Sequence, residues 1–532
     1  MIFKLIIQGR ISILPSKLKI SKVIGIIILT ALCLSCSTTR WHSRIYEPSQ
    51  YKEIDTAAPF LKCHTKTGEV YVLSDWEIQE EQKLISGQGS FYDVNRNLVK
   101  QDTFTIFLDS LALLETNQPE KVMHSQIGVM TVLTAASLAL TIYCITNPKA
   151  CFGSCPTFYA KDDTGGWALQ AEGFSSSIAK ILEEIDLDPL FTAHPKSKHF
   201  ELQMRNEALE THAVNSVRLY AVPKSRPATR VFKNNSGNFY PITTTVSPNY
   251  SSSTDPAFLS NIQCYDGKEY FSPAGDKNLA EKEVIELEFP VLAGHTGLAI
   301  RARNSLLSTY LFYQGLAYMG KAAGEYMAGL EAGEETLRKK AGGIGQVLGG
   351  IEILVRKTKG NWQKIGTFKY TGPIAHEVLI FPLPLELQND SLKVRLRLTK
   401  GHWRIDWVAL AQLESPVKPL ILEPQKVFKD SLEDHQALIS ILDTTSYLFT
   451  YPGDIYSLVF ELPSAPESYE LFLESSGYYY EWMRKEWLEE ENPQMVMLLF
   501  GKPEKALKKL APEYKKVESQ LEEIFWQSRI SR

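Results

Sequence analysis

SLKVRLRLTKGHWRIDWVALAQ, from Ser391 to Gln412, holds the pattern that decides the fold class. Its two halves, SLKVRLRLT and WRIDWVALA, have the composition of strands, and Gly401 separates them. Runs of the same kind occur at HFELQMRNE (199–207), SVRLYAV (216–222), VIELEFPV (284–291), LAIRAR (298–303), IEILVRK (351–357), WQKIGTFKY (362–370) and HEVLIFPLP (376–384). The sequence therefore predicts a mainly β protein with α insertions, in which residues 149–415 form a large β-sandwich-like domain.

One apolar helix is expected to interrupt this domain over residues 304–340. Asn304 or Ser305 can cap its start, and basic residues gather near its end, as the helix dipole prefers. Its first half is apolar nearly all round, so we expect it to be buried against its own sheet or against a partner. The glycine-rich stretch 341–350 that follows lies between a helix and a strand, the reverse of a dinucleotide-binding loop, and is interpreted as a linker.

The two flanks of the large domain are also predicted to be β-rich. Residues 58–116 contain EVYVLSDWEI, SFYDV and TFTIFLDSLALLE between glycine-containing turns, which indicates a small antiparallel barrel that resembles SH3-like or Sm-like barrels. Residues 416–532 predict a C-terminal β region, with strands at 447–463 and 469–482, that ends in short helices.

The first 35 residues form a lipoprotein signal pattern. A basic start precedes the uncharged run VIGIIILTALCLS, which is long enough for a signal peptide but short of the roughly 20 residues of a stable membrane span. The run ends at Ser35-Cys36, which resembles a lipobox of the loose kind found in Bacteroidota-like lipoproteins, although Cys33 stands where Leu is usual. We expect cleavage before Cys36 and its acylation, with an uncleaved anchor or acylation of Cys33 as the alternatives.

The predicted location follows from this signal. Residues 36–57 are polar and are interpreted as a linker that leads away from the membrane. Ser37 follows the cysteine without an acidic pair, which by resemblance to lipoprotein sorting rules favours the outer membrane, facing the periplasm. The membrane is then the first expected partner, through a diacylglycerol anchor.

A second apolar segment, expected as a helix over residues 120–148, contains nineteen uncharged residues from Ile127 to Ile145. Its length permits a membrane span. Three threonines, one serine and the topology that a second span would impose favour a helix buried by the protein or by a partner. An inner-membrane span remains the alternative.

Five cysteines remain after Cys36 in the mature chain: Cys63, Cys144, Cys151, Cys155 and Cys264. Their odd number leaves at least one thiol without an internal partner in an oxidising compartment. A disulfide between Cys151 and Cys155 is the expected pairing. The spacing of the cluster is not that of common zinc sites, and no metal site is predicted.

Composition and motifs exclude several function classes. The net charge is −4, from 57 basic and 61 acidic residues without a long run of either sign, so we expect no nucleic-acid partner. The sequence has no nucleophile elbow, metalloprotease helix or phosphate-binding loop, and its ten histidines are scattered. No catalytic residue and no cofactor are predicted.

The aromatic run at Tyr478, Tyr479, Tyr480 and Trp482 is the best candidate ligand site. Tyrosine and tryptophan faces stack on sugar rings, so the run could form a carbohydrate platform. Ordinary packing within a strand explains the same residues. Glu481, beside them, is a candidate for glycoside hydrolysis, which needs a second carboxylate opposite it.

Three passages resemble the C-terminal regions of FG-GAP repeat proteins that carry ASPIC/UnbV-type modules: MRNEALETHAVNSVRLYAV (204–222), SLKVRLRLTKGHWRIDWVALAQ (391–412) and TYPGDIYSLVFELP (450–463) with the following LFLESSGYYYEW. This resemblance covers about a quarter of the chain and implies a β-rich fold. The chain lacks the D-x-D-x-D-G calcium repeats of that family, so neither calcium binding nor a propeller is implied.

These observations lead to three functional hypotheses. The first is a lipid-anchored structural or interaction protein that binds another envelope protein through the apolar helices at 127–145 and 305–330. The second is a carbohydrate-binding lipoprotein, and the third is an envelope hydrolase. Exposed Tyr478 and Trp482 side chains would favour the carbohydrate-binding hypothesis. An uncovered apolar helix would favour the partner-binding hypothesis, and converging carboxylates in a deep cleft would favour the hydrolase hypothesis.

Overall fold

The computed structural model describes residues 38–122 and 155–529, apart from short gaps at 47, 57, 59, 68, 93–97, 196, 209, 254, 321, 324–325, 327–342, 358–359, 370, 388–390, 452, 464, 482–489 and 528. The predicted signal peptide, Cys36 and the apolar segment 127–145 lie outside these residues. The chain divides into two compact units, Met1–Leu133 and Thr134–Arg532, and the prediction of a mainly β fold is confirmed.

The smaller unit is one antiparallel sheet in the order β1-β6-β2-β3-β4-β5. Its strands are β1 (Thr38–Tyr46), β2 (Leu61–Thr65), β3 (Val70–Gln79), β4 (Leu84–Tyr92), β5 (Leu98–Phe107) and β6 (Leu111–Val122). Fully buried side chains, among them Leu61, Leu73, Ile85 and Leu114, form its core. The pairing of β1 with β6 corrects two predictions: Thr38–Tyr46 is a strand rather than part of a 36–57 linker, and the helix expected from residue 120 cannot begin there, because β6 continues to Val122.

The larger unit contains four sheets among its described residues. Sheet B comprises β25 (Leu432–Glu433), β24 (Lys426–Lys429), β27 (Ile455–Glu461), β10 (His199–Arg205), β7 (Thr157–Lys161) and β8 (Trp167–Glu172); sheet C comprises β23 (Leu420–Leu422), β11 (Glu210–Pro223), β28 (Tyr469–Glu481) and β9 (Glu184–Pro189), with β26 (Leu448–Thr450) also on β11. Sheet D comprises β13 (Phe239–Val246), β12 (Arg230–Lys233), β20 (Glu377–Pro382), β17 (Thr296–Asn304), β22 (Trp403–Leu413) and β15 (Tyr270–Phe271); sheet E comprises β14 (Tyr250–Ser251), β16 (Lys282–Phe289), β21 (Leu392–Thr399), β18 (Ile351–Lys357) and β19 (Gln363–Phe368).

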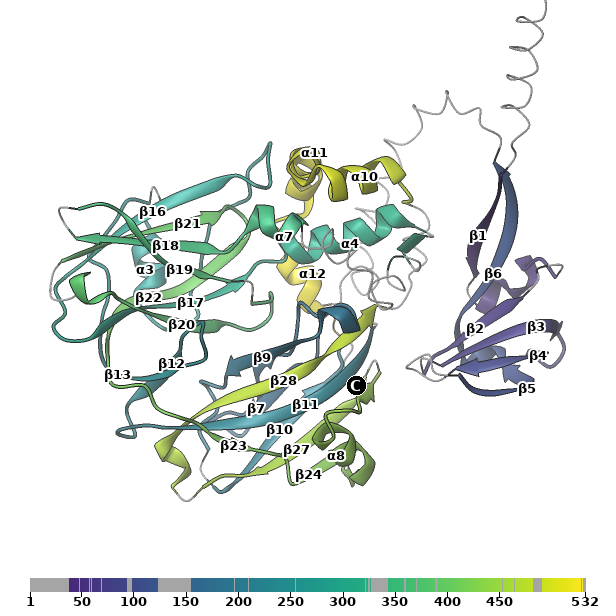
Figure 1. Cartoon of the computed structure of the whole chain (residues 1–532), viewed down its shortest axis with the longest axis horizontal. Helices are drawn as coiled ribbons and strands as arrows, with labels where there is room; N and C mark the ends of the chain where they lie inside the picture. The colour runs from purple at the N-terminus through teal and green to yellow at the C-terminus, as the bar shows by residue number, and fades with distance from the viewer. Residues whose placement is uncertain are drawn as a thin grey trace, which may run out of the picture. The chain divides into compact units, whose positions relative to one another are not determined.

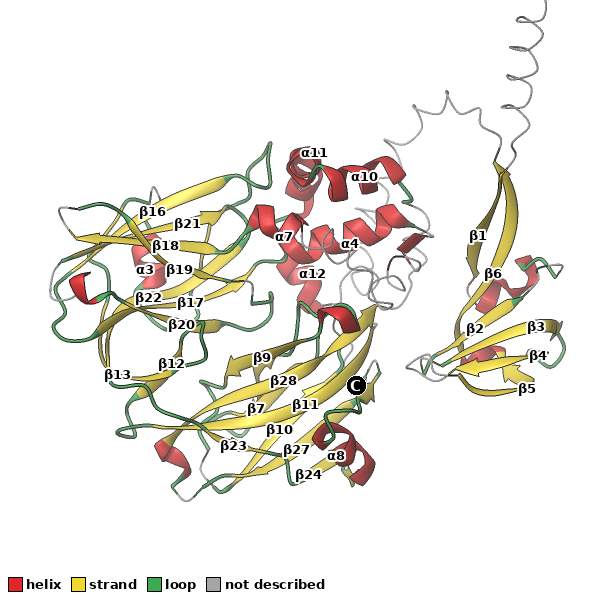
Figure 2. Ribbon diagram, viewed as in Figure 1, coloured by secondary structure: helices red, strands yellow, loops and turns green. Residues whose placement is uncertain are grey.

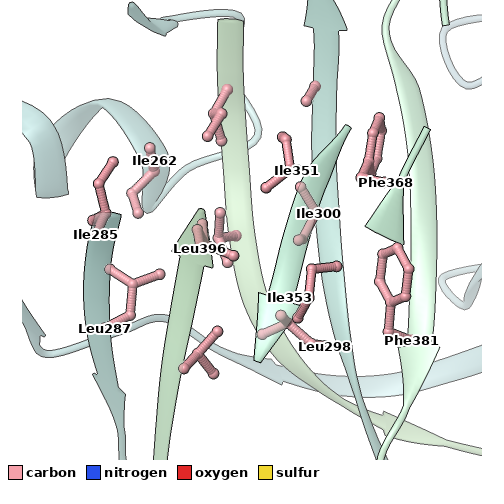
Figure 3. Close-up of a cluster of buried hydrophobic side chains, with 14 of the residues drawn as sticks. Ile262, Ile285, Leu287, Leu298, Ile300, Ile351, Ile353, Phe368, Phe381 and Leu396 are labelled. Atoms are coloured by element: carbon pink, nitrogen blue, oxygen red, sulfur yellow. The ribbon is translucent and has the colours of Figure 1, made fainter. Parts of the chain in front are cut away.

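These four sheets stack as layers in the order B, C, D, E (Figure 1). Strand β28 explains the stacking, because successive side chains of a strand point to opposite faces. Leu471 and Leu473 enter the core between sheets B and C, whereas Phe472 enters the core between sheets C and D. Sheets D and E enclose a third core of isoleucine, leucine and phenylalanine side chains (Figure 3).

The stretch from Ser391 to Gln412 forms the two predicted strands, but they do not pair with each other. Strand β21 lies in sheet E and β22 in sheet D, so the chain crosses between the layers at residues 400–402. Gly401 makes this corner with φ +72°, and a Cβ there would lie 2.4 Å from the Cβ of Ala274. Because both faces of sheet D are covered, most of β22 is buried.

The predicted division after residue 415 does not match the strand pairing. Strand β27 pairs with β10 and β28 pairs with β11, so segments from both sides of that boundary are joined within sheet B and alternate within sheet C. Residues 149–415 and 416–532 therefore form one structure. The region from 223 to 278 supplies further short strands, including β12 and β13, and the short helix α3 (Phe258–Ile262).

The helices of the larger unit, apart from α3 and α8 (His435–Leu442), group at one end of the sheets (Figure 2). The inserted helix is present as α4 (Leu307–Met319), which ends at Gly320 with φ +53°. It packs with α7 (Gly343–Leu348), α10 (Pro493–Gly501), α11 (Pro503–Val517) and α12 (Leu521–Gln527). The described part of the predicted partner-binding helix 305–330 is thus covered by the chain itself. Within the described ranges, no helix combines the length and apolarity needed to cross a membrane.

A chain that ends after residue 415 should fail to fold its larger unit, because β27 and β28 are interior strands of sheets B and C. Denaturant unfolding followed by tryptophan fluorescence would compare it with the full-length chain, which keeps β27 and β28. We expect a cooperative transition only in the longer chain. A cooperative transition of native steepness in the shorter chain would restore the predicted domain boundary.

Candidate functional site

A cavity of about 200 Å³ lies where β8, β11 and β28 meet helix α4. Its lining residues are Cys155, Glu172, Ser175, Ser176, Ile178, Glu210, Ser308, Thr309, Phe312, Tyr313, Pro373 and Tyr479. Cys155, Glu172 and Glu210 are buried and form its floor, whereas Ser176 is exposed and Ser308, Thr309 and Phe312 are half-buried. The cavity is therefore lined on one side by polar side chains of the sheets and on the other by the first turns of α4.

Glu172 is the last residue of β8 and is only 1% exposed. The backbone N–H of Ile374 donates to its Oε2 at 2.8 Å, and the Ala375 N–H and the Cys155 thiol also lie within hydrogen-bonding range. Burial raises the pKa of Glu172 to about 8, although these donors lower it. At neutral pH, the carboxyl is therefore mostly protonated.

The loop before β20 is shaped to receive this carboxyl. Gly372 has φ +92°, and a Cβ at this position would lie 2.5 Å from Glu172 Oε2. Only glycine combines that backbone conformation with such a close approach. The loop is held at its start by Asn304, whose backbone N–H donates to the Gly372 carbonyl at 2.9 Å and whose side-chain oxygen accepts from the Thr371 N–H.

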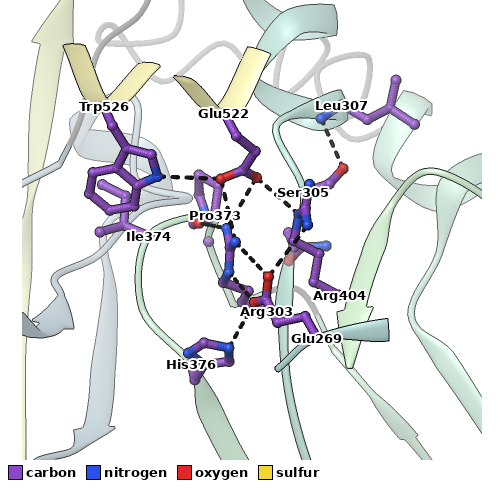
Figure 4. Close-up of polar contacts among 12 residues, drawn as sticks. Glu269, Arg303, Ser305, Leu307, Pro373, Ile374, His376, Arg404, Glu522 and Trp526 are labelled. Carbon is purple, nitrogen blue, oxygen red and sulfur yellow. Dashed lines mark hydrogen bonds and ion pairs between the residues drawn. The ribbon is translucent and has the colours of Figure 1, made fainter. Parts of the chain in front are cut away.

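An ion-pair network also contacts this loop, through the Pro373 carbonyl (Figure 4). Arg303 donates to the Pro373 carbonyl at 2.6 Å and forms a two-point contact with Glu269. His376 also contacts Glu269, at 2.8 Å, and Glu522 on α12 accepts from Arg303. Burial opposes the ionised form of Glu269, but His376 and Arg303 lower its pKa to about 2. The network therefore ties α12, sheet D and the cavity loop together.

Glu210 stands at the start of β11 and is fully buried. His212, two residues along the same face, contacts its Oε1 at 2.8 Å and reaches the Thr450 hydroxyl with its other ring nitrogen. Asn206 donates to the Glu210 carbonyl at 2.9 Å and so fixes the entry into the strand. Glu481 lies directly opposite Glu210 in the β11–β28 register.

The carboxylate at Glu481, predicted as a hydrolase candidate, accepts from the Tyr313 hydroxyl of α4. Tyr313 lines the cavity, whereas Glu481 lies beside it. Directly opposed residues of neighbouring strands have Cβ atoms about 4.5–5.5 Å apart, so the side chains of Glu210 and Glu481 begin close together, and each carboxyl contacts another residue, His212 and Tyr313 respectively. The hydrolase hypothesis stays a prediction, because Glu481 is not among the residues that line the cavity.

Cys155 supplies a buried thiol to the floor of the cavity. Burial raises its pKa well above the usual value, and the neighbouring carboxyl of Glu172 adds to this rise. Because the thiolate is the reactive form, this thiol is poorly suited to nucleophilic catalysis. Cys155 is a free thiol in the structure, and Cys151 lies outside the described residues, so the Cys151–Cys155 disulfide stays a prediction.

The predicted aromatic platform is not a surface at the positions that the structure describes. Tyr478 is 2% exposed and packs edge-on against Tyr447, with ring centroids 5.2 Å apart. Tyr479 is 7% exposed and donates to the Ser175 carbonyl at 3.2 Å, yet its side chain lines the cavity. Tyr480 is part of β28, and Trp482 lies outside the described residues.

Two features of the cavity limit its chemistry. None of its lining residues is lysine, arginine or histidine. No group of three or more histidine, cysteine, aspartate or glutamate side chains in the described part of the chain is arranged to hold a metal ion. Its side chains are suited to holding a small molecule through carboxyl, hydroxyl and aromatic contacts.

Sequence reasoning singled out Tyr479, Glu481 and Cys155 but missed Glu172 and Glu210. Both glutamates occupy ordinary strand text, WALQAE and ETHAV, where a charged residue usually faces solvent. The DTGGWALQAE hairpin gave no signal that its last residue would be covered by a loop 200 residues later. Gly372, in TGP, was the available clue to a tight turn.

Comparisons with known proteins add no family. No family model and no curated protein matches the sequence. Matched solved structures include an exo-β-1,3-galactanase from Phanerochaete chrysosporium, crystallised with β-1,3-galactotriose, at 7% identity and a TM-score of 0.15 over 70% of this chain and 69% of that one. Another is the Gx strain of infectious bursal disease virus, at 10% identity and a TM-score of 0.14 over 90% and 88% of the two chains. TM-scores this low do not establish a shared fold.

The raised pKa of Glu172 predicts a pH dependence of stability. Its folded pKa of about 8 exceeds the ordinary value of 4.5, so its protonation favours the folded state below pH 4.5, and this contribution is lost as pH rises to about 8. Glu172→Gln should therefore become more stable than the wild type, by a few kcal/mol at pH 8. Urea unfolding at pH 5 and pH 8 measures the change. Glu467→Gln, at an exposed site, is the control, and a Glu172→Gln curve parallel to it would refute this pKa.

Proposed function

We propose that this chain is an envelope lipoprotein whose larger unit is a receptor for a small polar ligand. The observation that carries the proposal is the cavity that has the buried carboxyl of Glu172 in its floor and hydroxyl and aromatic side chains in its walls. Ligand pockets combine apolar walls with a few placed polar groups, and buried groups with shifted pKa values cluster at functional sites.

The cavity is also preorganised. Backbone donors, Gly372 and the Arg303 network fix the Glu172 carboxyl and the loop around it. A binding group that is held in place before the ligand arrives loses little conformational entropy on binding. These contacts support a receptor role over a purely structural one.

The anchor remains part of this proposal on sequence grounds. Acylation at Cys36 would hold the chain to a membrane, in the outer membrane facing the periplasm, through a diacylglycerol group. That residues 58–116 form an SH3-like or Sm-like barrel, and that the β-rich part resembles the ASPIC/UnbV-type regions, are retained as proposals about the fold. An envelope protein as a further partner, through residues 127–145, is likewise retained.

A carbohydrate ligand is the second candidate, because Tyr479 lines the cavity and carboxyl and hydroxyl groups bind sugar hydroxyls. The volume of about 200 Å³ is below the roughly 300–1,000 Å³ of pockets for drug-sized ligands, so a single sugar ring is the largest such occupant. The sugar would enter the cavity rather than lie on a surface platform.

The receptor role predicts that small molecules stabilise the larger unit only while the cavity is open. Ser308→Trp would fill the cavity from α4, and Ser260→Trp, on the exposed face of α3, is the control. A library of small polar metabolites would be screened by thermal unfolding, since a ligand that binds only the folded state raises its stability. We expect ligands that stabilise wild type and Ser260→Trp but not Ser308→Trp. If no compound shows this selectivity, the receptor role fails.

The anchor predicts a second outcome. Cys36→Ser should release the protein from membranes or leave its precursor uncleaved, because acylation of this cysteine precedes cleavage of the signal peptide. Labelling with a fatty-acid analogue, followed by membrane fractionation, measures both effects. Cys33→Ser serves as the control. Loss of labelling in Cys33→Ser with retention in Cys36→Ser would move the anchor to Cys33.

A further inference from the structure

We propose that the cavity binds a small organic ammonium cation. The inference rests on the proposed receptor function and names the ligand class of the same site. Three independent features of the lining support it: a carboxyl seated on backbone donors, three aromatic rings, and a buried hydroxyl that points to a missing partner.

The backbone groups around Glu172 favour its ionised form, although burial keeps the carboxyl mostly protonated while the cavity is empty. The N–H groups of Ile374 and Ala375 both donate to it, and donors of this kind favour the ionised form. Desolvation disfavours the ionised form of Glu172, and no lysine, arginine or histidine lines the cavity to offset the free-energy cost of burying its negative charge. A cation that enters from solution would supply the missing charge.

The aromatic lining favours the same occupant. Phe312 and Tyr313 of α4 stand on one side of the cavity, with ring centroids 5.4 Å apart, and Tyr479 of β28 also lines it. The electron-rich faces of aromatic rings attract ammonium groups, and cages of such rings recognise quaternary ammonium ligands. A carboxylate combined with these rings distinguishes a cation from a neutral molecule of the same shape.

The Ser308 hydroxyl adds a third contact. Its oxygen is buried and has no hydrogen-bond partner within the described part of the chain, although it lines the cavity. Buried hydroxyls are normally satisfied, so an unpaired one at a cavity wall is a position for a ligand group.

Choline is the probe, and 3,3-dimethyl-1-butanol is its uncharged isostere, in which carbon replaces nitrogen. Calorimetry on the full-length protein at pH 7.5 would measure both. We expect choline to bind about tenfold or more tightly than the isostere, as the carboxylate and ring attractions together imply. Ethanolamine and glucosamine, with glucose as its neutral match, then distinguish quaternary from primary ammonium groups.

Variants connect this selectivity to the residues. Glu172→Gln keeps the shape of the side chain and should weaken choline by about tenfold while leaving the isostere unchanged. Phe312→Leu should weaken choline severalfold, and Glu467→Gln should change neither probe. Thermal unfolding of each variant confirms that the folded state is retained.

The outcomes separate this inference from the receptor role. Equal affinity for choline and its isostere, no binding of any ammonium probe, or full choline affinity in Glu172→Gln would each overturn the cation assignment. A neutral ligand that is excluded by Ser308→Trp would preserve the receptor role while removing the cation. If Ser308→Trp leaves choline affinity intact, the cation binds elsewhere and this site is excluded.

Discussion

The burial of sheet C on both faces is the constraint on which the larger unit depends. Strands β11 and β28 run side by side through its centre, and their side chains alternate between the core with sheet B and the core with sheet D. Because both faces are largely covered, most polar side chains of these strands lie near the strand ends or have partners inside the protein. Glu210, His212 and Glu481 lie near one such end, and Tyr313 of α4 donates a hydrogen bond to Glu481 there. The location of the cavity is therefore a consequence of the layering.

Much of the fold could be predicted from the sequence, because alternation and turn residues are local properties. The strand runs, the mainly β class and the terminal helices all follow from such patterns. Which strands pair with each other does not follow from these local patterns. The sequence from 447 to 482 looks locally like an independent C-terminal region, yet its strands β27 and β28 pair with β10 and β11, more than 240 residues earlier. The linker assignment failed for the same reason, since Thr38–Tyr46 becomes a strand only through its pairing with β6.

The site was harder to predict than the fold. Tyrosines 478 and 479 suggested a platform because aromatic residues are often exposed in binding proteins, but strand alternation in a doubly covered sheet buries either face. The sequence around Glu172 does not indicate that this residue is buried beside a cavity. Its environment is made by Gly372 and by the backbone of residues 374 and 375, and a single sequence does not indicate that this loop packs against the end of β8.

The Arg303 network explains how the cavity loop stays in place despite a buried acid beside it. A carboxyl without a cationic partner would tend to draw water or to displace the loop, and the two backbone donors from Ile374 and Ala375 offset only part of its desolvation. Arg303 is saturated by Glu269, Glu522 and the Pro373 carbonyl of this loop, and His376 and Arg404 complete the set (Figure 4). The arginines of this network pair with Glu269 and Glu522, so the network holds the loop but supplies no positive charge to Glu172. Burial therefore keeps Glu172 mostly protonated at neutral pH, and a positive charge that stabilises its ionised form would have to come from a bound ligand, as the proposed cation would supply it.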